Sequence, residues 1–177
     1  ADCPAAPETR PSSFVSPGSD RVHAERRPVT PVFMTVAPFK GEEIEYPVLQ
    51  ELYLDVLGIV RKHGGYVHHV DSLVASGARI MALFGAPVSS GMDTENGILA
   101  ALETVGRHAG RGDIRIGCGI DCGYVYSGTT GNEWRKQYTV IGDAVNTACR
   151  LADAAGDGMV TVSSRAASVA GDRIRYG

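Results

Sequence analysis

The segment QYTVIGDAVNTACRLADAAG, residues 137–156, predicts a strand, a tight turn at Gly142 and a helix. Asn146 and Arg150 stand four positions apart on that helix, so their side chains project from one face. They are either ordinary solvated positions or a pair that reaches toward an anionic ligand. A guanidinium holds phosphate through a forked pair of hydrogen bonds, and an amide can orient a ribose. The glycine would let the backbone approach such a ligand closely.

The flanking segments extend this pattern into a fold. DIRIGCGIDCGYVYSGTTG, residues 113–131, contains two strand-like runs broken at Asp121 or Gly123. It predicts a hairpin with Gly123 and Gly128 in turn or bulge geometry, and it lacks the Lys-Ser/Thr ending of a phosphate-binding P-loop. Two strand–helix–strand units in one chain predict an α+β fold with helices packed on a mainly antiparallel sheet. The further strands are expected at 28–39, 66–70, 78–85 and 158–164, and the helices at 46–65, 93–112 and from Ser164.

Composition limits the classes of protein to consider. The 177 residues suffice for one well-buried domain, and a net charge of -3 provides no basic field for nucleic acid and no polybasic membrane anchor. No stretch approaches the roughly 20 apolar residues that cross a bilayer. The four cysteines form neither a disulfide framework nor a zinc pattern, so the cytoplasm is the expected location. Residues 1–27, rich in Pro, Ser and charge, predict a linker or disordered arm.

Other conspicuous side chains are given structural roles. His68 and His69 are adjacent on a strand, so they should point to opposite faces and to solvent, and a shared metal is not expected. Cys149 is expected to be a small buried filler. Pro31 weakens the first strand because it donates no hydrogen bond. Asp93, or the threonine after it, is expected to cap the helix that begins there.

Several of these segments resemble one family. IRIGCGIDCGYVYSGTTGNEWRKQYTVIGDAVNTACRL (114–151) resembles the signature region of class III adenylate and guanylate cyclase catalytic domains. RPVTPVFMTVAPF (27–39) resembles the first strand of that fold, and HGGYV (63–67) with GARIMALFGAPVSSGMDTENGILAAL (77–102) its middle. The resemblance assigns residues 28–177 to a cyclase homology domain, which we expect to continue beyond the last residue. It implies a ferredoxin-like α+β fold that works as a dimer, with each active site completed by both subunits.

The resemblance also implies a chemistry. In this family a ribose 3′-hydroxyl attacks the α-phosphate of a nucleoside triphosphate, with two Mg²⁺ or Mn²⁺ ions held by two aspartates. By position, Asn146 falls on the residue that aligns the ribose and Arg150 on the residue that stabilises charge at phosphorus. Thr139 falls on a position that reads the base. Its uncharged hydroxyl favours adenine, and therefore ATP, with GTP as the alternative.

The departures from the family pattern are equally informative. The two metal aspartates would align with Thr35 and Ala78, neither of which replaces a carboxylate as a ligand of hard cations. The lysine that usually touches the base is absent too. This pattern resembles the second, non-metal cyclase domain of soluble, bicarbonate-responsive adenylate cyclases and their bacterial relatives. A homodimer would hold two Asn/Arg halves and no metal half, so we expect it to be inactive.

Two functional hypotheses follow from the sequence. In the first, the chain is half of an enzyme: Asn146 and Arg150 act on ATP whose Mg²⁺ or Mn²⁺ is held by a partner cyclase domain. In the second, the chain is a non-catalytic regulatory domain that binds nucleotide or only dimerises. The absent lysine favours the second hypothesis.

Overall fold

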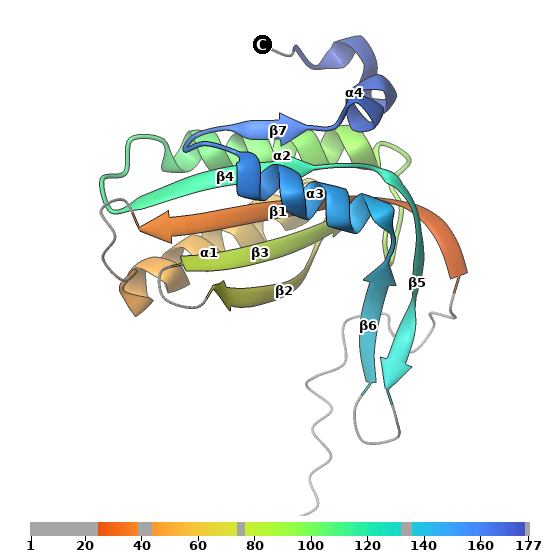
Figure 1. The fold of residues 1–177 in the computed structure, drawn as a ribbon, viewed down its shortest axis with the longest axis horizontal. Helices are drawn as coiled ribbons and strands as arrows, with labels where there is room; N and C mark the ends of the chain where they lie inside the picture. Colours follow the sequence, from red (N-terminus) through yellow and green to blue (C-terminus); the bar gives the residue numbers. More distant parts are fainter. Residues whose placement is uncertain (1–24, 39–43, 74–76, 132–135, 176–177) are drawn as a thin grey trace, which may run out of the picture.

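The computed structural model describes residues 25–38, 44–73, 77–131 and 136–175, and its elements follow the order expected from the sequence (Figure 1). The first strand begins at Glu25, inside the predicted arm, whose other residues lie outside the described part of the chain. The strands are β1 Glu25–Pro38, β2 Tyr66–Leu73, β3 Gly77–Phe84, β4 Ile114–Ile120, β5 Gly123–Gly131, β6 Lys136–Ile141 and β7 Val160–Val162. The helices are α1 Tyr46–Lys62, α2 Asp93–His108, α3 Asp143–Ala154 and α4 Ser164–Ala170, followed by a 3₁₀ turn at Gly171–Arg173.

The strands form one sheet with helices on both faces. Its order is β2-β3-β1-β4-β7, and β5 leaves this path by pairing with β1 and β6. Each pairing is antiparallel except that of β4 with β7. Helices α1 and α2 lie on one face and α3 on the other (Figure 1). The predicted α+β fold with a mainly antiparallel sheet is therefore confirmed.

Strand β1 lies at the centre of the sheet although it contains Pro31. Its first residues pair with β5 as far as Val29, and its pairing with β4 begins at Val32. Pro31 lies between these two ladders, at the point where β1 exchanges one neighbour for the other. The missing N–H group therefore costs no hydrogen bond on this edge of the strand, and the strand is longer than the sequence suggested.

The hairpin of this region is not the predicted one. Strands β4 and β5 are separate at Asp121 as expected, but they do not pair with each other. β5 instead pairs with β6, from Tyr126 opposite Ile141 onward. Gly123 and Gly128 both occupy regular positions of β5 rather than a turn or bulge. β4 and β5 pair with successive parts of the same edge of β1, so the chain bends between them.

Helices α1 and α2 cover the larger core. α1 buries Leu52, Val56 and Ile59 at helical spacing and ends before Gly64, whose φ of 77° suits glycine. α2 begins at Asp93, but this side chain does not cap the helix. Its carboxylate instead accepts hydrogen bonds from the loop before the helix, including one of 2.9 Å from the Ser90 N–H. No helix among the described residues is long and apolar enough to cross a membrane.

Helix α3 crosses β4 at backbone-to-backbone distance. A Cβ added to Gly119 would stand 2.0 Å from the Ala152 nitrogen and 2.3 Å from the Ala148 oxygen. The helix contributes its own alanines to this contact, so no flexible side chain separates the two backbones. The absence of a side chain at Gly119 therefore sets the distance between α3 and the sheet.

We expect Gly119→Ala to lower the free energy of unfolding by about 3 kcal/mol, because the helix must move away from the sheet to admit one methyl group. Gly58→Ala on α1 is the matched control. Nothing lies within 4 Å of its added Cβ, so this change should stabilise the helix by about 0.5–1 kcal/mol. Urea unfolding followed by circular dichroism measures both, and a negligible loss in Gly119→Ala would contradict the close contact.

Candidate functional site

Helix α3 presents one side to the sheet and the other to solvent. Ala144, Ala148 and Ala152 recur every four residues and are buried in the second core. Asn146 and Arg150 lie off this stripe and are exposed. One helical turn separates them, so both side chains reach the same part of the surface. The structure brings this predicted pair together and keeps it out of the core.

Thr139 lies on β6, the strand that leads into α3. Both of its neighbours in the strand are buried, so the alternation of side chains places Thr139 on the other face of the β5–β6 hairpin. It pairs with Gly128, a position without a side chain. Gly142 then connects β6 to α3, and a Cβ there would stand 2.9 Å from Val125 Cγ1. The absence of a side chain at Gly142 is therefore needed for the packing of this turn against β5.

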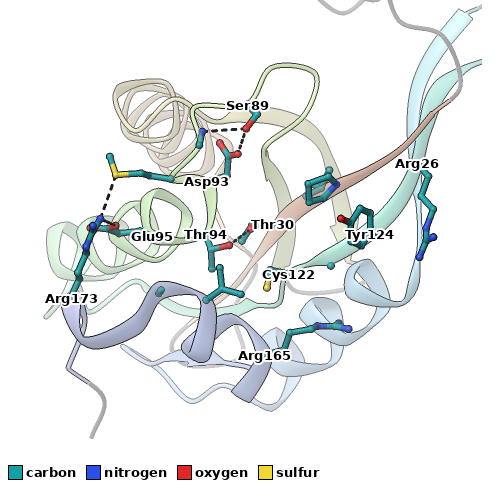
Figure 2. A pocket seen from close by; sticks show the side chains of 17 residues that line it. Arg26, Thr30, Ser89, Asp93, Thr94, Glu95, Cys122, Tyr124, Arg165 and Arg173 are labelled. Carbon is teal, nitrogen blue, oxygen red and sulfur yellow. Dashed lines mark hydrogen bonds and ion pairs between the residues drawn. The ribbon is translucent and has the colours of Figure 1, made fainter.

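The predicted site residues occupy an open surface. Three cavities among the described residues, of about 920, 150 and 100 Å³, are lined by other side chains. The largest lies between β1, the start of α2, the β4–β5 connection and α4 (Figure 2). A ligand enclosed at Asn146, Arg150 and Thr139 therefore needs a second surface opposite them.

A family model decides which family this arrangement belongs to. The model of the adenylate and guanylate cyclase catalytic domain matches residues 43–175. The chain is a member of this family. The resemblance noted in the sequence is thereby confirmed, and so is the fold that it implied.

The similar proteins include adenylate cyclases, and a guanylate cyclase domain shares the fold. Human adenylate cyclase type 10 is 29% identical over 133 residues, which cover 72% of this chain and 8% of that protein. The adenylyl cyclase CyaB of P. aeruginosa superposes with a TM-score of 0.67 at 27% identity. The superposition covers 87% of this chain and 85% of the CyaB chain. The guanylate cyclase domain of RhGC from Catenaria anguillulae, solved with GTP, has a TM-score of 0.70 at 19% identity, with coverage of 85% and 86%. This cyclase domain spans 8% to 19% of the length of the first curated relatives it matches.

In the cyclase domain, the two positions that align with the family's metal aspartates lie on neighbouring strands. Thr35 of β1 stands opposite Arg79 of β3, and Ala78 stands opposite Val36. Because paired residues share a face and successive residues alternate, Thr35 and Ala78 belong to opposite faces. Thr35 Oγ1 is buried without a hydrogen-bond partner among the described residues.

The Arg79 guanidinium lies beside Thr35, a position where the family pattern has a metal-binding aspartate. Arg79, opposite Thr35, forms an ion pair with Asp153 and donates to Cys149 Sγ at 3.3 Å. Cys149 is thus half-buried and in contact with a charge, rather than a buried filler. Mg²⁺ and Mn²⁺ prefer carboxylate and carbonyl oxygens, so a threonine, an alanine and a fixed positive charge do not fit them. The described ranges contain no group of three or more His, Cys, Asp or Glu residues arranged to hold a metal.

The adjacent histidines lie together, contrary to the sequence prediction. A bulge in β2 between Val67 and His69 breaks the alternation, and the Nδ1 atoms of His68 and His69 lie within hydrogen-bonding distance. His68 Nε2–H donates to the Tyr138 carbonyl at 2.8 Å, which ties β2 to β6 immediately before Thr139. The pair therefore has a structural role beside the predicted base-reading position, which strand periodicity alone could not indicate.

Sequence reasoning missed the side chains around the largest cavity. Asp121 is completely buried, and both its carboxylate oxygens accept hydrogen bonds from Arg165. Arg26 of β1 stacks on the Tyr124 ring of β5, with Cζ 4.8 Å from the ring centroid. The partners are 44 and 98 residues apart in the chain, so no local spacing announces them. In the sequence, the one sign of this cluster is an acidic residue, Asp121, directly after the apolar run that forms β4.

We expect the cyclase domain to lose stability as the pH falls from 7.5 to 5.5. Burial first, and then the neighbouring His69, lower the pKa of His68 below its ordinary value of 6.5, and burial acts likewise on His108. Below about pH 6.5 the unfolded chain therefore binds more protons than the folded chain, and the free energy of unfolding decreases. Carboxylates contribute little in this range, because their unfolded pKa values lie near 4.

Urea unfolding at several pH values measures this dependence. His68→Gln removes one of the two groups, so the difference in unfolding free energy between pH 7.5 and pH 5.5 should shrink. A stability that is flat, or that rises toward pH 5.5, would contradict the neutral state of the buried imidazoles.

Proposed function

We propose that this cyclase domain supplies Asn146 and Arg150 to a composite nucleotide site whose divalent cations are held by a partner cyclase domain. The carrying observation is an asymmetry between the residues of α3 and those of β1 and β3. Asn146 and Arg150 on α3 are exposed and accessible to a ligand. Thr35 and Ala78, in contrast, offer no carboxylate for a metal ion. Because the pair lies outside every cavity described above, a second subunit is needed to enclose the substrate.

The chemistry follows from the side chains that α3 carries. The 3′-hydroxyl of the nucleotide loses its proton, its oxygen bonds to the α-phosphorus, and pyrophosphate leaves. Arg150 would donate hydrogen bonds to the phosphoryl oxygens as negative charge grows on them. Asn146, one turn earlier, would hold the ribose in the orientation for attack. The close packing of the α3 backbone against Gly119 would keep both groups in place.

The substrate is proposed to be ATP from the cytoplasm, with GTP as the alternative. Thr139 offers a hydroxyl that donates to or accepts from a base edge. Similar proteins include adenylate cyclases, and a guanylate cyclase domain solved with GTP shares the fold. A non-catalytic regulatory role is the second candidate, favoured by the fixed guanidinium of Arg79 beside Thr35. In that role the domain would pair with a partner without contributing to turnover.

The decisive experiment uses a partner that cannot complete its own site. The catalytic domain of P. aeruginosa CyaB, with its own transition-state asparagine and arginine replaced by alanine, is joined to this domain by a flexible linker. Any cyclic AMP formed from ATP and Mn²⁺ must then use Asn146 and Arg150. We expect turnover from the fusion and none from either domain alone, and sedimentation verifies that the two domains associate.

Arg150→Ala in the fusion should reduce kcat by about 100-fold, because it removes a charge that acts on the transition state. Arg61→Ala, the same change at an exposed position of α1, is the matched control and should leave turnover unchanged. An associated fusion that binds ATP and makes no product would favour the regulatory role. Equal turnover in the Arg150 and Arg61 variants would rule out the assigned chemistry.

Thr139→Val tests the base contact separately in the same fusion. Loss of one neutral hydrogen bond costs about 1 kcal/mol, so the KM for ATP should rise roughly fivefold while kcat stays constant. A change confined to kcat would place Thr139 outside the base site. The ratio of cyclic AMP to cyclic GMP, measured with both substrates, reports which base the hydroxyl reads.

A further inference from the structure

The largest cavity is separate from the α3 surface and is large enough for a small molecule. Its volume of about 920 Å³ falls in the range of ligand pockets. Figure 2 shows Arg26 and Tyr124 on one side of it, and Glu95 and Arg173 on the other. Much of the remaining wall is apolar and includes Pro28, Val29, Met92, Val169 and Ala170.

Arg26 brings a positive charge to this cavity without a carboxylate to neutralise it. Its guanidinium lies 4.8 Å from the centroid of the Tyr124 ring, and no ion pair joins it to any residue of the described ranges. The neighbouring Arg27 differs, because it pairs with Glu25 at 2.9 Å and donates to the Pro87 carbonyl. A guanidinium stacked on an aromatic face keeps its outer N–H groups available for an anion.

Arg165 adds a second guanidinium with a fixed orientation. Its Nε and Nη2 donate to the buried Asp121, and these bonds raise the pKa of Arg165. Half of the side chain remains exposed at the cavity. Asp121 neutralises much of this charge, but the group is held in place, so a hydrogen bond to a ligand costs little side-chain entropy.

The acids of the cavity wall are already engaged. Glu95 pairs with Arg173 at 2.8 Å. The Asp93 carboxylate accepts hydrogen bonds from Ser89 and Ser90 in the loop before α2. Glu95 is thus neutralised by Arg173, whereas Asp93 keeps its negative charge, which its hydrogen bonds direct into the loop before α2. Attraction for an anion is therefore concentrated at Arg26, on the other side of the cavity.

We propose that this cavity binds a small amphipathic organic anion. Its acidic group would accept hydrogen bonds from Arg26 and Arg165, and its hydrocarbon or ring portion would lie against Val29, Met92 and Val169. The site also meets the helix that carries Arg150, since Arg165 Nη2 lies 3.9 Å from Asp143, the first residue of α3. Binding itself does not depend on the function proposed for α3.

The probe is 8-anilinonaphthalene-1-sulfonate, with N-phenyl-1-naphthylamine as its uncharged analogue. Fluorescence titration of the full chain should show one saturable sulfonate site, with the analogue bound more weakly. Arg26→Ala should weaken the sulfonate at least about tenfold, the cost of a charge-assisted hydrogen bond, and leave the analogue unchanged. Arg61→Ala is the matched control and should behave as the unmodified chain.

Further variants separate this site from alternatives. Val169→Trp should fill the cavity and weaken both dyes, whereas Arg150→Ala should affect neither, which distinguishes the cavity from the nucleotide site. Displacement of the sulfonate by decanoate identifies an acyl anion as the ligand class, and displacement by AMP a nucleotide. The proposal is overturned if Arg26→Ala has no effect, if Arg150→Ala weakens the sulfonate equally, or if neither competitor displaces it. Near-ultraviolet circular dichroism verifies that each variant retains its tertiary structure.

Discussion

The position of α3 depends on the absence of one side chain from β4. At Gly119 the backbones of strand and helix lie too close to admit a methyl group. This contact places the alanine stripe of α3 on the sheet and turns Asn146 and Arg150 toward solvent. Because protein interiors are close-packed, a displacement here would move the whole helix rather than one side chain.

Two ion pairs then fix the ends of the same helix. Arg165, anchored on the buried Asp121, approaches Asp143 at the first residue, and Arg79 holds Asp153 near the last turn. Exposed pairs of this kind add little stability, so the close contact at Gly119 remains the main constraint on the helix. Arg79 also brings positive charge beside Thr35, where other members of this family are expected to hold a metal aspartate. The same guanidinium therefore joins α3 to β3 beside Thr35.

The cyclase domain consequently divides the features of an active site unevenly. An arginine and an asparagine are exposed on α3, outside the cavities formed by the described residues. The cavity of about 920 Å³ lies elsewhere, between β1, α2 and α4, and is lined by a different set of arginines. The exposed α3 surface suits the proposed assembly with a second domain, whereas a concave pocket suits a small ligand. The two surfaces meet at Arg165.

The sequence determined the order of elements, the α+β class, the family and the pairing of Asn146 with Arg150, because each depends on local periodicity or on motifs within one segment. It misjudged the His68–His69 pair and predicted a β4–β5 hairpin that does not form. The bulge in β2 arises in its pairing with β3, and β4 and β5 are kept apart because both pair with β1, far away in the chain. The contact of α3 with Gly119 and the cavity of Arg26 and Arg165 join residues far apart in the chain. Only the tertiary structure decided these, since no short-range pattern encodes a distance between backbones.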